Sequence, residues 1–248
     1  MKWYKSLSNS KSRQQEGYFL VEGFRATEQI VNAYPESVEE ILISEIKDTL
    51  PFEHKCPVRT LTESQLDSIC TSHTPQGIVS VVKLPQRCYT AEPPQNYGSA
   101  ILMLEHVQDP GNVGTLIRTA AAFNYSGVLL SSQCADPFSP KVVQSSSGAI
   151  LSVWIRRTDY YLEMVSRFKT DGLVVLAADV YGDQRFEDIK NCSHVLALGN
   201  EGAGLSAELL SLCNTRFQIP FDSSKVESLN VAVAGAIAMF YLKNRSVC

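Results

Sequence analysis

The sequence lacks the long apolar runs that membrane insertion and secretion require. No part of the 248-residue chain contains an uninterrupted apolar stretch approaching the roughly 18–20 residues of a membrane helix. The segment Met1–Ser10 also lacks the apolar region of a secretory signal. We therefore expect a cytoplasmic protein that does not enter a membrane.

Signatures of disulfide, metal and nucleotide chemistry are absent as well. The seven cysteines are scattered without a C-x-x-C pair, and the four histidines show no metal-ligand spacing. We therefore expect reduced thiols and no metal site. Neither the dinucleotide pattern G-x-G-x-x-G nor the phosphate loop G-x-x-x-x-G-K-[ST] occurs, which disfavours a nucleotide-dependent oxidoreductase.

Positive charge is scarce for a protein that would bind nucleic acid. The formal net charge is −4, whereas contacts to phosphate normally use lysine and arginine. The first fifteen residues are an exception, because they carry four basic residues and no acidic one: Lys2, Lys5, Lys11 and Arg13. This segment is either an arm that lies along a phosphate backbone or a solvated terminal helix, and the sequence favours neither.

Apolar patterning divides the chain into two α/β units. In the N-terminal part, strand-like runs at 18–21, 38–43 and 77–82 and near Val58 are interspersed with a helical pattern after Gly23 and a helix begun by Thr62. Prolines and polar residues between Leu84 and Gly98 favour a semi-rigid connector. We therefore predict a small domain at 1–84, a linker at 85–98 and a larger domain at 99–248.

The larger unit has the pattern of a parallel sheet. Strand-like runs at 100–104, 127–131, 173–178, 194–198 and 215–219 alternate with helix-like stretches, as in sheets covered by helices on both faces. Ligands of such sheets bind at the carboxyl ends of the strands. The segments that follow the strands are therefore the first candidates for chemistry.

Three of these segments have unusual composition. After the first strand, Asp109-Pro110-Gly111 forms a turn, and Asn112 is expected to cap a helix that carries Arg118. The segment 196–206 holds three glycines, which let backbone amides approach a ligand, and ends at a predicted helix cap, Ser206. The polar segment 219–230 precedes a helix at 231–242 rich in alanine. Each segment alone also fits an ordinary turn.

Together the segments resemble the motifs of a known family. N-x-G-x-x-x-R at 112–118, L-G-N-E-G at 198–202 and I-P…V-E-S-L-N at 219–230 resemble, in order and separation, the three motifs of the SpoU/TrmH family of RNA ribose methyltransferases. The stretches F-L-V-E-G-F-R at 19–25 and T-P-Q-G-I-V-S-V at 74–81 resemble the substrate-binding domain of that family. The resemblance therefore spans nearly the whole chain.

The resemblance implies a fold and an activity. The fold would be α/β, with a small N-terminal α/β RNA-binding domain and a parallel-sheet catalytic domain that ends in a C-terminal trefoil knot, and the protein would be a homodimer formed around that knot. Patterning alone would not predict a knot, because knotted chains are rare. The activity would be S-adenosylmethionine-dependent methylation of a ribose 2′-hydroxyl in RNA, ribosomal RNA in preference to tRNA.

Carried over position by position, the resemblance also implies site residues. Residues around the transferred methyl group and the ribose would be Asn112, Arg118, Glu201, Ser228 and Asn230. Residues that hold S-adenosylmethionine would be Leu198, Gly199, Asn200, Gly202, Ile219, Pro220 and Leu229. Predicted RNA contacts are Lys11, Arg13, Arg25 and Lys141, and Gln144 stands where relatives often carry arginine.

The resemblance implies that Arg118 could complete the site of the partner subunit. Its chemical role there has two interpretations. The family role is that of a general base, yet a guanidinium has a pKa above about 12 and is not expected to lose its proton. Arg118 is therefore either deprotonated transiently in a desolvated site, or it clamps a phosphate and stabilises the developing alkoxide.

Other functions stay open at this point. A tRNA substrate is compatible with the same motifs. A non-catalytic RNA-binding or assembly protein of this fold is a second alternative, although the presence of Arg118, Glu201 and Asn230 counts against it. Binding of S-adenosylmethionine in a calorimeter would separate an enzyme from a scaffold.

Overall fold

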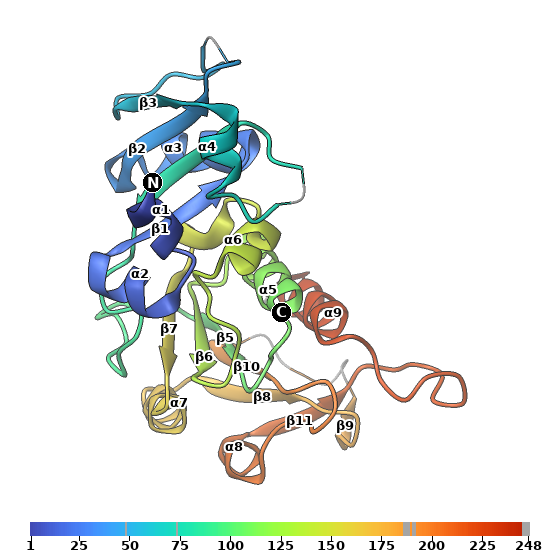
Figure 1. The fold of residues 1–248 in the computed structure, drawn as a ribbon. Coiled ribbons are helices and arrows are strands. Elements are labelled where there is room, and N and C mark those ends of the chain that lie inside the picture. Colours follow the sequence, from blue (N-terminus) through green and yellow to red (C-terminus); the bar gives the residue numbers. More distant parts are fainter. Residues whose placement is uncertain (48, 73, 186–188, 190–191, 245–248) are drawn as a thin grey trace.

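The computed structural model describes residues 1–47, 49–72, 74–185, 189 and 192–244. Its strands form two sheets, a four-stranded sheet from the N-terminal part and a seven-stranded sheet from the rest of the chain. Figure 1 shows the smaller sheet at one end of the molecule, with α6 (Pro140–Ser146) between it and the larger sheet. The chain therefore has an α/β fold with two layered units in contact.

The smaller sheet is mixed, in the order β1-β4-β2-β3. Strands β1 (Tyr18–Glu22) and β2 (Val38–Ser44) pair antiparallel with β4 (Ile78–Lys83), and β3 (Val58–Leu61) pairs parallel with β2. Its helices are α1 (Lys2–Ser6), α2 (Ser10–Glu16), α3 (Phe24–Ala33), the 3-10 turn η1 (Pro35–Ser37) and α4 (Glu63–Asp67). The predicted start of a helix at Thr62 is confirmed, because Thr62 caps α4 in a capping box with Gln65.

The larger sheet is parallel, in the order β7-β6-β5-β10-β8-β11-β9. Strand β10 lies between β5 and β8, and β11 lies beyond β8. The strands are β5 (Ala100–Leu104), β6 (Gly127–Ser131), β7 (Trp154–Thr158), β8 (Val174–Ala178), β9 (Gln184–Arg185), β10 (His194–Leu198) and β11 (Thr215–Gln218).

Helices cover both faces of this sheet, as predicted. On one face lie α5 (Pro110–Ala122), α6, the 3-10 turn η2 (Ala149–Leu151) and α9 (Val231–Asn244); on the other lie α7 (Tyr161–Thr170) and α8 (Ala207–Leu212). Side chains of β5 alternate between the two layers. Leu102 packs in the core that includes Leu116 of α5, whereas Ile101 packs in the core that includes Phe168 of α7.

The strand pattern was predicted to within a residue or two, except at the sheet edges. The edge strand β7 was missed because Arg156 and Arg157 interrupt its apolar run. Both guanidinium groups donate to backbone carbonyl oxygens: Arg156 Nε to Glu92 O at 2.7 Å, and Arg157 Nη2 to Cys134 O at 3.1 Å. The two-residue edge strand β9 was also missed.

Helix α9 packs closely on α5. A Cβ atom on Gly235 would lie 2.4 Å from Leu116 Cδ2 and 2.7 Å from Leu198 Cδ1, so a larger residue there would require these leucine side chains to move. At the other end of the contact, the rings of Phe123 and Phe240 lie 6.0 Å apart. Among the described residues, no helix is both long and apolar enough to cross a membrane.

The two sheets share one hydrophobic core. The ring of Phe19 in β1 lies 5.1 Å from that of Phe138, which follows β6, and both rings are fully buried. Ile30 of α3 and Val142 of α6 belong to the same cluster. The N-terminal unit is therefore packed onto the larger sheet through apolar contacts.

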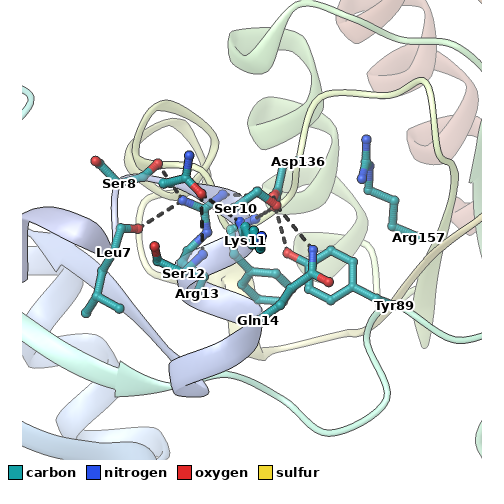
Figure 2. A network of polar contacts seen from close by, with 12 residues as sticks. Leu7, Ser8, Ser10, Lys11, Ser12, Arg13, Gln14, Tyr89, Asp136 and Arg157 are labelled. Atoms are coloured by element: carbon teal, nitrogen blue, oxygen red, sulfur yellow. Dashed lines mark hydrogen bonds and ion pairs between the residues drawn. The ribbon is translucent and has the colours of Figure 1, made fainter. Parts of the chain in front are cut away.

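A buried ion pair joins the same two parts (Figure 2). Arg13 of α2 donates from Nη2 to Asp136 Oδ2 at 2.8 Å and from Nη1 to the carbonyls of Leu7 and Ser8 at 2.9 and 2.7 Å. Asp136 also accepts from the Ser10 hydroxyl, from Tyr89 Oη at 2.9 Å and from Phe138 N at 2.9 Å. Burial alone would raise the pKa of Asp136, but the bond from Ser10 and the charge of Arg13 outweigh it and lower the pKa.

The segment 85–98 packs along β7 instead of spanning solvent. It lies between β4 and β5, where the linker was predicted. Cys88 is buried, and its carbonyl accepts from Arg157 N at 2.8 Å. The carbonyl of Tyr97 accepts from Trp154 Nε1 at 3.1 Å. These contacts hold the segment against the edge of the larger sheet.

Candidate active site

The first loop runs from the end of β5 to α5. Asp109 caps α5, since its carboxylate accepts from Asn112 N at 2.8 Å, and Pro110 occupies the first helical position. The prediction that Asn112 is the cap is therefore wrong, because Asn112 is the third residue inside the helix. Its side chain is thus free to reach across to other loops. Gly114, two residues after Asn112, allows α6 to approach, since a Cβ there would lie 2.5 Å from Val142 O.

The second loop, 199–206, connects β10 with α8. Asn200 and Gly204 form a backbone bridge across it. The Asn200 side chain accepts from Gly202 N at 2.9 Å and donates to His106 O, also at 2.9 Å, which ties this loop to the first one. Ser206 accepts from Leu209 N at 3.1 Å, so the predicted cap of α8 is confirmed.

The third loop, 219–230, connects β11 with α9 and extends away from the sheet in Figure 1. It ends at Asn230, whose side-chain oxygen accepts from Ala232 N at 2.9 Å and Val233 N at 3.3 Å. These are the bonds of a helix N-cap. The side-chain amide of Asn230 therefore projects from a fixed point at the start of α9.

The three loops meet through hydrogen bonds between side chains that the sequence singled out. Asn112 Nδ2 donates to Glu201 Oε1 at 2.6 Å, and Asn230 Nδ2 donates to Asn112 Oδ1 at 3.1 Å. Asn112 thus bridges residues that lie 89 and 118 positions away in the sequence. We call Asn112, Glu201 and Asn230 the three-loop junction.

A cavity of about 390 Å³ lies beside this junction. Of the predicted site residues, those that line it are Leu198, Gly199, Asn200, Glu201, Gly202, Ile219, Ser228 and Leu229. Its size lies within the range of small-molecule sites, about 300–1,000 Å³. Pro220, Asn112, Asn230 and Arg118 are outside its lining.

The loop after β8 also lines the cavity, and the sequence interpretation missed it. Ala178, Asp179, Val180 and Tyr181 take part, and Arg216 of β11 joins them. Asp179 holds this loop, because it accepts from Arg216 Nη2 at 2.6 Å and from Tyr181 N at 3.0 Å. The sequence held one signal: this loop follows the apolar run at 173–178, which was itself predicted as a strand of the parallel sheet, and ligands bind where such strands end.

Arg118 and the predicted RNA contacts lie elsewhere. Arg118 is exposed on α5 and does not face the cavity of its own chain. Lys11, Arg25 and Lys141 are exposed on α2, α3 and α6. The prediction for Arg13 is wrong, because its side chain is only 2% exposed and its guanidinium is bound to Asp136 and two carbonyls. Its Nε has no hydrogen-bond partner among the described residues, but it is buried and therefore out of reach of a phosphate. Within the described part of the chain, no cluster of three or more His, Cys, Asp or Glu side chains could hold a metal.

Comparison with known proteins identifies the family. Residues 99–240 match the SpoU rRNA Methylase family, and residues 1–80 match the MRM3-like substrate binding domain. The chain is 31% identical over 247 residues to the 23S rRNA (guanosine(2553)-2′-O)-methyltransferase RlmP of Bacillus subtilis, covering 98% of this chain and 95% of the relative.

Two solved structures agree over the full length. A Porphyromonas gingivalis protein assigned to the TrmH family of RNA methyltransferases has a TM-score of 0.84 at 35% identity, covering 99% of this chain and 97% of the other. The AdoMet-bound rRNA methyltransferase of Sinorhizobium meliloti has a TM-score of 0.80 at 26% identity, covering 97% and 92%. The chain therefore belongs to the SpoU rRNA methylase family, as its three motifs predicted.

Proposed function

We propose that this protein transfers the methyl group of S-adenosylmethionine to a ribose 2′-hydroxyl of ribosomal RNA. The observation that carries the proposal is the three-loop junction, which sets polar side chains of three separate motifs beside one cavity. Membership of an RNA methyltransferase family and a full-length relative that methylates 23S rRNA support both the reaction and the substrate.

The cavity suits the cofactor. Its apolar residues Leu198, Ile219 and Leu229 would pack against an adenosine, and the carboxylate of Glu201 lies on the same wall for the positive charges of the methionine part. Gly199 has no room for a side chain, because a Cβ would lie 2.3 Å from Gly204 C. When bound, S-adenosylmethionine supplies an activated methyl group on a sulfonium.

The protein's contribution is then mainly placement, because the ribose oxygen must lie in line with the methyl carbon. We assign this placement to the three-loop junction, in which Asn112 is oriented by Glu201 on one side and Asn230 on the other. Ser228 lines the cavity next to the junction and would contact the ribose side of the bound cofactor. Pro220 follows Ile219 of the cavity lining, and its ring would restrict the backbone at the start of the third loop.

We assign Arg118 to the site of the partner subunit in a homodimer. Arg118 is exposed and lies outside the lining of the cavity in its own chain, which is consistent with a role in a site supplied by another chain. An apolar stripe on the neighbouring helix α9 supports a second copy there: Val233, Ile237 and Phe240 are 49%, 40% and 58% exposed and recur at helical spacing. Burial of this stripe would bring α5 of one chain to the partner.

In that position Arg118 acts as an electrostatic clamp. A guanidinium keeps its proton at neutral pH, and its fork of donors matches a phosphate or a developing alkoxide. It lowers the barrier by stabilising negative charge on the attacking ribose oxygen. The released proton then leaves through water.

The remaining features of the family are part of the same proposal. We assign residues 1–84 to RNA binding, 85–98 to the connection and 99–248 to catalysis, with Lys11, Arg25 and Lys141 as contacts to phosphate. We also propose that the segment leading to α9 closes a trefoil knot. The return of Asn230 and α9 to α5 supports it, since the end of the chain packs against the first helix of the larger unit.

Exchange of Arg118 tests the mechanism. Arg118→Ala should leave the Kd of S-adenosylmethionine unchanged in calorimetry and abolish methyl transfer to ribosomal RNA. Unchanged turnover would refute the role of Arg118. Mixing Arg118→Ala with Gly199→Ala, in which cofactor binding should be weakened, should restore transfer, because the intact cavity of the first chain receives Arg118 from the second. Failure to complement would refute sharing of the site.

Mapping of ribose methylation tests the substrate. RNA from cells with and without the protein should differ at a ribose of ribosomal RNA. A difference confined to tRNA would show that the substrate is tRNA and not ribosomal RNA. A wild-type protein that gives no binding heat with S-adenosylmethionine would instead be an RNA-binding scaffold.

A further inference from the structure

Glu105 has a buried carboxyl group that lies between the first and second loops. No role has been assigned to this residue above. It follows β5 directly and is 1% exposed. Its Oε1 accepts from the hydroxyls of Tyr161 at 2.7 Å and Ser206 at 2.6 Å, and its Oε2 accepts from Ser206 N at 2.6 Å. Both oxygens are thus bonded to the end of the second loop or to the start of α7.

The next residue holds the other end of the same loop. His106 has a left-handed backbone, φ +57°, which is uncommon for a residue with a side chain. In this conformation its N–H donates to Ser131 Oγ at 2.9 Å and its carbonyl accepts from Asn200 Nδ2 at 2.9 Å. Two consecutive residues, Glu105 and His106, therefore fix Ser206 and Asn200. Gly202 and Gly204 lie between these two anchored positions.

We propose that Glu105 is a positioning residue that holds the loop 199–206 in the shape that binds S-adenosylmethionine. This inference rests on the proposed function, since it concerns the cofactor loop. Glycine-rich segments lose much conformational freedom when they become ordered. A loop that is already fixed spares the cofactor that loss and binds it more tightly.

The bonding of Glu105 supports a specific role over general packing. A buried carboxyl group is costly unless its oxygens are hydrogen-bonded, and here the bonds come from the loop that it holds. Ser206 uses the same hydroxyl to cap α8, so the bond from Glu105 also fixes where that helix starts. Burial and the bond to Glu105 raise the pKa of Tyr161, which therefore remains a donor.

Two substitutions at this position separate the hydrogen bonds from the charge. In Glu105→Gln the amide oxygen can accept from Ser206 N, while its NH₂ group faces the hydroxyls of Tyr161 and Ser206, each of which can turn to accept. The loop stays anchored. In Glu105→Leu the side chain has similar size but no acceptor, so the half-buried Ser206 N–H loses its partner.

The experiment measures the Kd of S-adenosylmethionine by calorimetry, and KM and kcat for methyl transfer, on the full chain. We expect Glu105→Gln to stay within about threefold of wild type and Glu105→Leu to raise the Kd at least tenfold. At saturating cofactor, kcat of Glu105→Leu should recover to within about threefold, because Glu105 touches no reacting atom. Asp136→Asn is the matched control: it alters another buried carboxyl group and lowers the melting temperature, yet should leave the Kd unchanged.

The outcomes distinguish this inference from the proposed function. Absence of binding by wild type would reject the function itself. Binding by wild type, with Glu105→Leu within threefold of it, would overturn the positioning role, as would an equal rise in Kd in Asp136→Asn. If Glu105→Leu does not fold, Ser206→Ala decides: it removes the hydroxyl bond to Glu105, and an unchanged Kd would likewise overturn the inference.

Discussion

Replacement of Arg13 by alanine should destabilise the protein by several kilocalories per mole, since the Arg13 guanidinium is part of a buried ion pair. Replacing it by alanine removes the ion pair with Asp136 and the two bonds to the carbonyls of Leu7 and Ser8. The carboxylate of Asp136, 13% exposed, is then left without its cation between the two units. Arg13→Ala therefore removes one partner of a buried ion pair and leaves the other in place.

The expected cost is large. Removing one member of a buried pair destabilises a protein by about 3–5 kcal/mol. At about 2–4 °C per kcal/mol for a chain of this size, the melting temperature should fall by roughly 6–20 °C. The lowered pKa of Asp136 adds a pH dependence: its contribution is present above the ordinary carboxyl pKa and is lost as pH falls through the lowered value.

Urea and thermal unfolding of Arg13→Ala at neutral pH measure this cost. Lys11→Ala on the same helix is the control, since its exposed side chain should change stability by no more than about 0.5 kcal/mol. A loss below about 1 kcal/mol in Arg13→Ala would refute the reasoning. Weakened RNA binding with unchanged stability would restore the original prediction.

Three further changes test other parts of the structure. Burial lowers the pKa of His194, whose ring lies 2.8 Å from Tyr125 Oη. As pH falls below about 6.5, His194 is protonated in the unfolded chain but stays neutral in the folded one, so the free energy of unfolding should drop by at most about 1.4 kcal/mol per pH unit. Urea titrations of His194→Gln at several pH values should lack this slope. Gly199→Ala should raise the Kd of S-adenosylmethionine at least tenfold in calorimetry, because a Cβ meets the backbone of Gly204 at 2.3 Å; wild-type affinity would show that the loop can shift. Ile237→Glu should turn a dimer into a monomer in light scattering, and an unchanged mass would place the interface elsewhere.

The strands and the loops of the site were predictable because their signals are local. Buried parallel strands are short apolar runs, and ligand loops follow their carboxyl ends. The rule was applied to β5, β10 and β11 but not to β8, whose loop carries Tyr181 without a glycine-rich or family motif. Strand order, which makes β8 a neighbour of β10, is set by tertiary contacts that periodicity does not encode.

Other errors came from choices between similar side chains. Asp109 and Asn112 are both good helix caps, and Pro110 decides between them because proline favours the first position of a helix. Arg13 and Lys11 are both basic residues of one terminal segment. Only the fold brings Asp136, 123 positions away, to Arg13.

The three-loop junction has a consequence for synthesis of the chain. Asn230 is synthesised 118 residues after Asn112, and only after β11, which ends at Gln218. A nascent polypeptide on the ribosome therefore holds an unfinished pocket even after most of the larger sheet has emerged. Retention on a column of immobilised S-adenosylhomocysteine would consequently select molecules that have completed folding, and chains truncated before α9 should pass through it.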